Sequence, residues 1–233
     1  MENAIVSFRN VSKRYQLTEA VHHVSFDLPA GKIVGFIGPN GSGKTTTLKL
    51  MTGLLRPNDG QVLFQNNQVR RIMAEHISYL SDASAVYNFY TVGQMVDYYQ
   101  GLYKDFSQDK ASAMLDFMEL DRNQRVRALS KGNLGRLKIV LSVSRRAPLI
   151  VMDEPISGLD PMVRESILKG LISFVDLEYQ TVVLSTHEVS EVEPLLDMAI
   201  LLDHGNVKAM DYTDHIRETL GAGIIDWMKQ VLT

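Results

Sequence analysis

Short apolar runs recur along this chain, and turn residues such as glycine, proline, asparagine and aspartate separate them. Apolar runs of this length between turns are typical of β-strands. Residues 24–28 alternate apolar and polar side chains, which predicts a strand with one exposed face. Together these patterns predict strands over residues 3–8, 24–28, 32–37, 61–64, 76–80, 149–152 and 181–184.

Between residues 84 and 146 the pattern changes to the spacing of amphipathic helices. Two further helices are expected to flank residues 129–132, and another helix is expected over residues 46–52. The apolar stripes that carry this prediction consist of Val92, Met95, Val96 and Tyr99 and of Ala113, Met114, Phe117 and Met118. Strands that alternate with helices favour an α/β fold whose mainly parallel sheet is covered on both faces.

A glycine-rich stretch lies between the predicted strand 32–37 and the predicted helix 46–52. Its pattern, G-x-x-x-x-G-K-T, is that of the phosphate-binding P-loop. The glycines let successive N–H groups point at one anion, and the following helix adds its dipole. Lys44 can reach the β- and γ-phosphates of ATP, and the Thr45 hydroxyl can bind Mg²⁺. The residues expected to contact the nucleotide are Gly38, Pro39, Asn40, Gly41, Ser42, Gly43, Lys44, Thr45 and Thr46.

Two acidic residues end the predicted strand 149–152. Active sites in open α/β sheets lie at the carboxyl ends of strands, so Asp153 is expected to bind Mg²⁺ near the P-loop. Glu154 can orient or deprotonate the water that attacks the γ-phosphate. The alternative is an acidic surface turn that is followed by Pro155.

Composition narrows the functions that this chain can have. The formal net charge is −3, which gives no basic field for nucleic acid, so no nucleic-acid partner is expected. The absence of cysteine excludes disulfides, thiol catalysis and thiolate metal sites, and it is consistent with a reducing cytoplasm. We expect neither a signal peptide nor a membrane-spanning segment, because no apolar run has the required length. Any membrane role would then come through a separate protein.

Further short motifs stand in the order found in ATP-binding-cassette (ABC) ATPases, and the chain resembles this family over residues 3–212. Residues 129–133, Leu-Ser-Lys-Gly-Asn, resemble the signature motif, which usually reads LSGGQ. Residues 157–160 resemble the D-loop, His187 resembles the switch histidine, and Tyr15 stands where the family has an adenine-stacking aromatic residue. The resemblance implies a P-loop NTPase core with a mainly parallel sheet, an antiparallel β portion on the N-terminal side and an inserted helical lobe.

The resemblance also implies that two copies bind two ATP molecules between them, head to tail. Ser130 and the N–H of Gly132 would cap the γ-phosphate bound to the other copy, and Asp160 would contact that copy. His187 would hydrogen-bond the γ-phosphate and hold the attacking water, and Tyr15 would stack on adenine. Without the resemblance, the histidine would be a satisfied side chain after a strand, and the tyrosine would cover a sheet edge.

Three departures from the family pattern leave alternatives open. Lys131 replaces the usual glycine and Asn133 the usual glutamine of the signature, although some bacterial exporter subunits have a similar LSKG form. Lys131 brings a cation near the opposite phosphate, or it points to solvent. Asp82 stands where the family has glutamine or glutamate, and it binds Mg²⁺ or water, or it is only a turn residue.

We expect one domain over residues 1–233, with a core formed by residues 1–83 and 147–212. Residues 84–146 form the inserted helical lobe, and a helical tail over residues 213–233 packs on its own domain or crosses to a second copy. Aromatic side chains gather at the start of the lobe, where they form its core or a groove for a partner. They are Tyr87, Phe89, Tyr90, Tyr98, Tyr99, Tyr103 and Phe106.

The hypothesis that follows is an ATP-hydrolysing subunit of a transporter of the bacterial exporter type, with Lys44, Glu154 and His187 as catalytic residues and ATP and Mg²⁺ as cofactors. Its expected partners are a second copy or a paralogous ATPase subunit and an integral membrane permease. The expected location is cytoplasmic, peripheral at the inner face of the cell membrane. The alternatives are a non-transport ABC ATPase and a P-loop kinase that acts on a small molecule.

Overall fold

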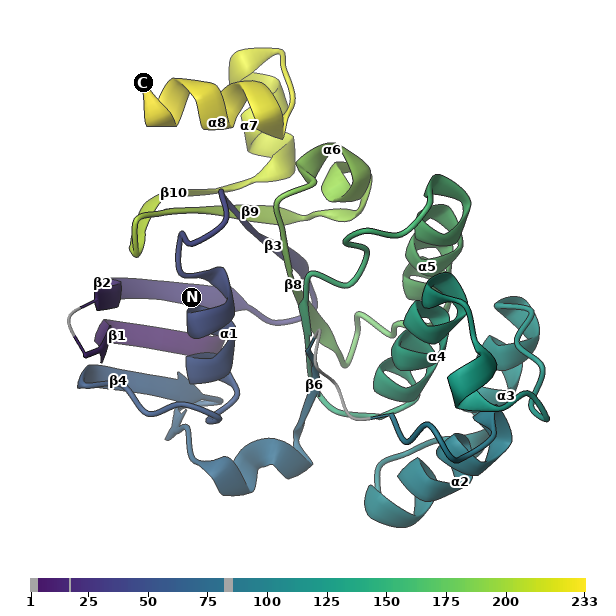
Figure 1. The fold of residues 1–233 in the computed structure, drawn as a ribbon. Coiled ribbons are helices and arrows are strands. Elements are labelled where there is room, and N and C mark those ends of the chain that lie inside the picture. Colours follow the sequence, from purple (N-terminus) through teal and green to yellow (C-terminus); the bar gives the residue numbers. More distant parts are fainter. Residues whose placement is uncertain (1–3, 17, 82–85) are drawn as a thin grey trace.

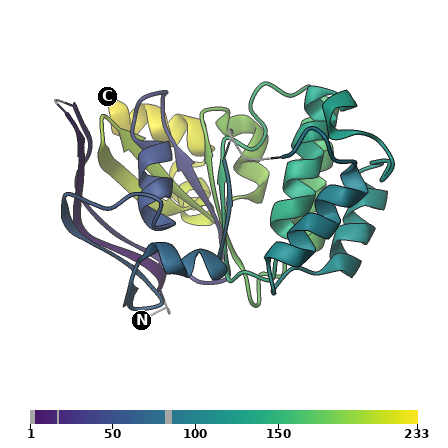
Figure 2. The same cartoon turned by 60° about the horizontal axis from the view of Figure 1, so that its bottom comes forward.

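The computed structural model describes residues 4–16, 18–81 and 86–233. In this part of the chain a mainly parallel sheet forms the central layer. An antiparallel sheet and helix α1 (Lys44–Met51) cover one face of the central layer, and a group of helices covers the other face (Figure 1). Figure 2 shows the antiparallel sheet and the helices on opposite sides of the central layer.

The central sheet has the strand order β10-β9-β3-β8-β7-β6 among the described residues. The neighbours from β9 to β6 pair in parallel, and β10 pairs with β9 in antiparallel fashion. The strands are β3 (Ile33–Ile37), β6 (Ile77–Leu80), β7 (Leu149–Asp153), β8 (Thr181–Thr186), β9 (Met198–Asp203) and β10 (Asn206–Tyr212). The smaller sheet is antiparallel with the order β2-β1-β4-β5 in the same described part, and it consists of β1 (Ala4–Tyr15), β2 (Thr18–Pro29), β4 (Asp59–Phe64) and β5 (Asn67–Gln68).

Four of the helices on the other face, α2 to α5, begin with a side chain that caps the first turn. Thr91 and Gln94 form a capping box at the start of α2, and Ser107 accepts a hydrogen bond from the Lys110 N–H at the start of α3. The remaining helices are α2 (Val92–Leu102), α3 (Gln108–Phe117), α4 (Lys131–Val143), α5 (Pro161–Phe174), α6 (Val189–Val192), α7 (Thr213–Leu220) and α8 (Ile224–Leu232). Short 3₁₀ turns are η1 (Arg71–Glu75), η2 (Val126–Ala128) and η3 (Glu193–Leu195).

The uninterrupted apolar runs are explained by burial on both faces of the central sheet. Every residue of β3, β7 and β8 is buried. Along β3, Ile33 and Ile37 pack into the core beneath the helices, whereas Val34 and Phe36 pack into the core shared with α1 and the antiparallel sheet. Burying one such side chain completely contributes about 1.5–3 kcal/mol. A central strand with two apolar faces is thus strongly held in its register.

All the predicted strands are confirmed, and β1 and β2 are longer than predicted. The strands β9 and β10 were not predicted. The expected helix over residues 46–52 is confirmed as α1, which begins at Lys44. Tail residues 224–232 form helix α8, which packs on its own chain through the buried Ile224 and Trp227.

Two details of the helix prediction are wrong. The buried face of α3 consists of Ala111, Met114 and Leu115, followed by Met118, whereas Ala113 and Phe117 are exposed. The expected helix before residue 129 is replaced by a turn and by η2. In that turn the Asp121 carboxylate accepts a hydrogen bond from the Asn123 N–H, which competes with helix formation.

Candidate functional site

The carboxyl ends of neighbouring parallel strands bring the predicted site residues to one edge of the central sheet. The P-loop follows β3, Asp153 ends β7, and His187 follows β8. The strands β7, β8 and β3 are direct neighbours, and Asp153 pairs with Ser185 in the register of β7 and β8. Sheets of this kind bind ligands at this edge because the loops there surround one crevice.

The P-loop, residues 38–45, has a backbone that requires glycine. The φ angles of Gly38 and Gly43 are 147° and 101°, in the region that favours glycine. A Cβ atom at Gly38 would lie 2.1 Å from the Leu202 carbonyl oxygen, and one at Gly43 would lie 2.5 Å from the Ala20 carbonyl oxygen. The loop is therefore pressed between β9 and β2, and Pro39, Asn40, Gly41 and Thr45 remain exposed on its open side.

Lys44 lies inside the loop at the first position of α1. Its ammonium donates hydrogen bonds to the carbonyl oxygens of Gly38 at 2.8 Å and Pro39 at 3.1 Å, and it lies 3.6 Å from Glu154 Oε1. Burial lowers the pKa of Lys44, and the carboxylates of Glu154 and Asp153 act in the opposite direction. A cation held inside a loop of N–H groups is well placed to receive a polyanion.

Thr45 and Asp153 form a pair of oxygen ligands beside this cation. The Thr45 hydroxyl donates to Asp153 Oδ1 at 3.0 Å, and Ser185 Oγ donates to the same oxygen at 2.7 Å. The Tyr79 hydroxyl is buried nearby and makes no hydrogen bond with a described residue. Burial, together with the Asp153 carboxylate, raises the pKa of Tyr79, so this hydroxyl stays protonated at neutral pH.

Glu154 lies between Lys44 and His187. Its Oε2 is 2.9 Å from His187 Nδ1, and its backbone N–H donates to Ser185 Oγ at 3.0 Å. The φ angle of Glu154 is 50°, an uncommon conformation for a residue other than glycine. Strained backbone of this kind occurs preferentially at functional sites, where the surrounding structure holds it in place.

Three residues of the signature and D-loop segments, Ser130, Gly132 and Asp160, lie at or next to the starts of helices. Ser130 caps α4 by accepting a hydrogen bond from the Asn133 N–H at 3.1 Å, and Asp160 caps α5 by accepting one from the Val163 N–H at 3.0 Å. A Cβ atom at Gly132 would lie 2.8 Å from Val163, so glycine permits the close packing of α4 on α5. Among the described residues, none of these three hydrogen-bonds to the P-loop.

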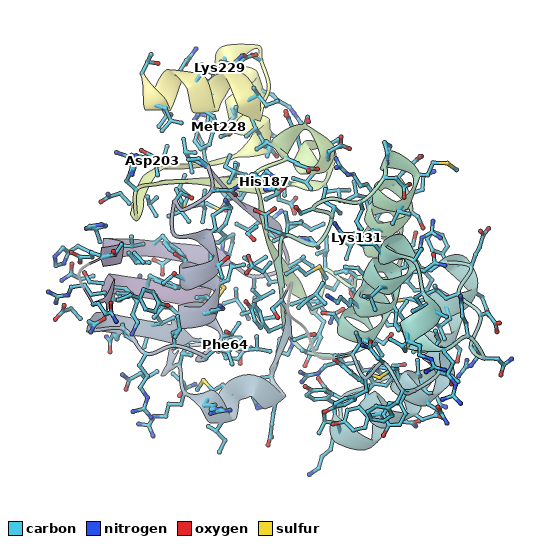
Figure 3. All side chains as sticks on the ribbon, in the orientation of Figure 1. Phe64, Lys131, His187, Asp203, Met228 and Lys229 are labelled. Atoms are coloured by element: carbon cyan, nitrogen blue, oxygen red, sulfur yellow. The ribbon has the colours of Figure 1, made fainter. Side chains whose placement is uncertain are left out.

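Lys131 is exposed at the first position of α4, and its ammonium packs against Gly158, where a Cβ atom would lie 2.5 Å from it. Figure 3 shows that Lys131 and His187 come from different elements, the start of α4 and the segment after β8. Asp82 lies outside the described residues. The preceding Ser81 lines a cavity of about 170 Å³ together with Asp153 and Glu154.

Tyr15 ends β1 with 44% of its side chain exposed, and the Lys13 ammonium lies 5.6 Å from the centre of its ring. The neighbouring strand β2 reaches the P-loop, since the Ala20 carbonyl oxygen approaches Gly43 closely. The turn after β9 also touches the loop, because the Gly205 N–H donates to the Ser42 carbonyl oxygen at 3.0 Å. An exposed ring at this end of the hairpin is accessible to a flat ligand.

Sequence reasoning missed Ser185, which joins two predicted residues. Replacing it with alanine removes the hydroxyl that donates to Asp153 and accepts from the Glu154 N–H. We expect a loss of about 1–3 kcal/mol in the free energy of unfolding, measured with urea, and slower ATP turnover. Ser142→Ala is the matched control, because that buried hydroxyl bonds with Ser78 instead. Equal turnover in the two variants would contradict the positioning role of Ser185.

Two negative findings concern the described residues. None of their helices is long and apolar enough to cross a membrane. No group of three or more His, Asp or Glu side chains in the same part of the chain could hold a metal ion.

Comparison with known proteins agrees with the geometry. A family model described as ABC transporter matches residues 21–157. The ABC transporter ATP-binding protein YtrB of Bacillus subtilis is 28% identical over 217 residues, which are 92% of this chain and 74% of that protein. The daunorubicin/doxorubicin resistance ATP-binding protein DrrA of Streptomyces peucetius is 30% identical over 225 residues, or 91% of this chain and 67% of that protein.

Solved structures support the fold. An ATP-binding subunit of an ABC transporter has a TM-score of 0.84 at 23% identity, with 98% of this chain and 100% of that chain covered. A dimeric ATP-binding cassette in a post-hydrolysis state, bound to ADP and Pi, has a TM-score of 0.78 at 24% identity, with 89% and 98% covered. The predicted fold class is confirmed. The chain belongs to the ABC transporter family, as one of its ATP-binding domains.

Proposed function

We propose that this chain is the ATP-hydrolysing subunit of a membrane transporter and that ATP closes it head to tail on a second copy or a paralogous subunit. The observation that carries the proposal is the position of Glu154, whose carboxylate lies 3.6 Å from Lys44 and 2.9 Å from His187 at the mouth of the P-loop. One base, one cation and one orienting histidine are thus gathered where a γ-phosphate would lie.

The P-loop fits a nucleotide phosphate chain. Ser42 Oγ is buried and has no hydrogen-bond partner among the described residues, as expected for a group that completes its bonds with a ligand. Lys44 exchanges its two carbonyl partners for phosphate oxygens, and Tyr15 offers its exposed ring to adenine. The exposed side of the loop leaves room for this exchange.

Thr45 and Asp153 fit a magnesium ion that arrives with the nucleotide. Magnesium prefers oxygen ligands and is usually held by one or two carboxylates plus substrate phosphates and water. Their oxygens lie 3.0 Å apart, close enough to bind one ion directly or through water. When bound, the ion would neutralise charge that develops on the phosphates. Asp82 is a further candidate that lies outside the described residues.

Glu154 accepts the proton of the attacking water, and His187 orients its carboxylate. An ionised carboxylate only accepts hydrogen bonds, so His187 Nδ1 is the donor in the 2.9 Å contact. We assign the second ring nitrogen of His187 to the contact with the γ-phosphate.

A second copy would complete the site. Ser130, Gly132 and Asp160 stand at the starts of α4 and α5, where helix N-termini present N–H groups to an anion. Because they do not hydrogen-bond to their own P-loop in the described part of the chain, their roles in ATP binding are assigned across the interface. Within one chain, Ser130 and Asp160 act only as helix caps.

The aromatic cluster offers a surface for a membrane permease. Phe89 is 63% exposed and Tyr87 37% exposed, and their ring centres lie 5.5 Å apart. Tyr90 packs partly against the core of the helical layer. Exposed aromatic patches of this kind mark protein interfaces. We place the subunit on the inner face of the cell membrane, held there by the permease.

Co-purification with an integral membrane protein from the membranes of the source organism tests this role. Changing Phe89 and Tyr90 together to serine is expected to reduce the bound membrane protein about tenfold, since aromatic anchors dominate interface energy, and to spare the ATPase activity of the free subunit. Phe89→Ser alone tests the exposed ring without disturbing the core. Ile172→Ser, which removes a side chain 61% exposed on α5, is the matched control. Full recovery in the double variant would show that these rings do not hold the partner.

A further inference from the structure

A basic groove lies between the end of α1, the β4–β5 hairpin and η1. Its volume is about 470 Å³, within the range of sites that bind ligands. Leu50, Leu55, Val62 and Val69 supply the apolar part of its lining. Figure 1 shows α1 and β4 beside each other at this place, with η1 as the helical turn below them.

Three arginines line this groove without a partner. The side chains of Arg56, Arg70 and Arg71 are exposed and form no ion pair or hydrogen bond with a described residue. None of the described residues that line the groove is a carboxylate, and the nearby Asp59 is engaged by Arg14 at 2.6 Å. By contrast, five arginines elsewhere in the described part, Arg9, Arg14, Arg145, Arg164 and Arg217, are paired with carboxylates. The groove is therefore locally positive, although the chain as a whole has a net charge of −3.

The walls of the groove are packed together. Gly53 has a φ angle of 73°, and a Cβ atom there would lie 3.0 Å from the backbone of Arg70. The loop after α1 is thus pressed against the start of η1, whose Met73 packs against the core beneath the antiparallel sheet. Ile72 and Leu54 flank the arginines with 76% and 49% of their side chains exposed. The charges thus stand on a fixed wall beside exposed apolar side chains.

We propose that this groove binds an acidic segment of the membrane partner protein that also carries apolar side chains. The inference rests on the proposed function, because it assigns a second contact to the same partner. Carboxylates would pair with the guanidinium groups, and apolar side chains would cover the lining. A concave apolar floor suits a protein segment better than lipid headgroups, which need only a flat basic surface. Figure 1 places η1 and α2 along the same lower edge of the molecule, so one partner can reach both surfaces.

Helix α1 connects this groove with the nucleotide. Leu50 near its C-terminal end lines the groove, and Lys44 at its first position lies in the P-loop. A helix of this length spans about 12 Å, given a rise of 1.5 Å per residue. A partner segment in the groove would contact the far end of the helix that holds the phosphates. Partner binding and nucleotide binding can then influence each other through one rigid element.

The test uses the tagged full-length chain and detergent-solubilised membranes of the source organism. Arg56→Glu and Arg71→Glu are each expected to lower the recovery of the membrane protein about five- to tenfold and to leave the ATPase activity of the free chain unchanged. Arg146→Glu is the matched control, since it is an exposed arginine outside the groove and gives the same change in charge. Because the chain has no cysteine, Gln68→Cys can carry a single photo-crosslinker into the groove.

The crosslinker is expected to mark a segment of the membrane protein that is rich in Asp and Glu. Crosslinks to phospholipid alone, or to a segment without carboxylates, would overturn the proposal. Equal recovery with Arg71→Glu and Arg146→Glu would also overturn it, while recovery by the unaltered chain would leave the proposed function standing. If the unaltered chain recovers no membrane protein, both the partner in the proposed function and the assignment of this groove fail.

Discussion

Lys44→Ala is expected to lower ATP turnover by about 10²–10³-fold or more, because it removes the only full positive charge of the P-loop, residues 38–45, from the phosphates. The fold should remain intact, since the lost ammonium bonds only to the loop carbonyl oxygens of Gly38 and Pro39 and lies near Glu154. Burial disfavours the charge of Lys44 and lowers its pKa. Removing this buried charge therefore offsets part of the stability that is lost with its hydrogen bonds.

Turnover is measured by phosphate release, and folding by circular dichroism and urea unfolding. Lys49→Ala is the matched control, because Lys49 lies in the last turn of the same helix, away from the phosphates. A folded Lys44→Ala chain that hydrolyses ATP at the rate of the Lys49→Ala chain would contradict the assignment of this loop as the phosphate site.

Glu154→Gln is expected to slow hydrolysis by about 10²–10⁴-fold, the usual contribution of a general base, while ATP binding persists. Glutamine keeps the shape of the side chain, but its single oxygen can face only one of Lys44 and His187, and it cannot take a proton from water. Bound ATP is then not consumed, so the ATP-closed state accumulates by mass action.

The rate is measured in single turnover with Mg²⁺ and ATP, which separates chemistry from product release. Glu165→Gln, an exposed change on α5 that breaks only the pair with Lys169, is the control. A normal single-turnover rate in the Glu154→Gln chain would show that another group activates the water.

Much of the fold could be predicted because its strands are buried on both faces. The runs that became β3, β7 and β8 are apolar at consecutive positions, and this pattern depends little on tertiary context. The run from Met198 to Leu202 had the same signal and could have been found. By contrast, β10 is only half-buried, so its residues show no clear pattern. The buried face of α3 was misplaced because Phe117 is apolar yet exposed.

The candidate site likewise contains residues that the sequence predicts and one that only the tertiary structure reveals. Lys44, Thr45, Asp153 and Glu154 lie in local motifs, whereas Ser185 acquires its position only from the register of β7 with β8. That register is a tertiary property, and the sequence around a serine in a buried strand does not reveal it.

The structure of one chain does not show the contacts that residues make across an interface. Ser130 and Asp160 are helix caps here, and Lys131 lies against Gly158 of its own chain. Their proposed contacts require a second subunit, so only an experiment on the assembled state can test them.

The assembled state is tested most directly by measuring the mass of the Glu154→Gln chain in solution, by size-exclusion chromatography with light scattering. The closed dimer should appear with millimolar Mg²⁺ and ATP as twice the monomer mass of 26.2 kDa, and the monomer should appear with ADP. Adding Ser130→Arg should restore the monomer in ATP, because a bulky cation would block the site across the interface. Monomer mass in both nucleotides, together with undiminished hydrolysis, would contradict a base that acts inside an ATP-closed dimer.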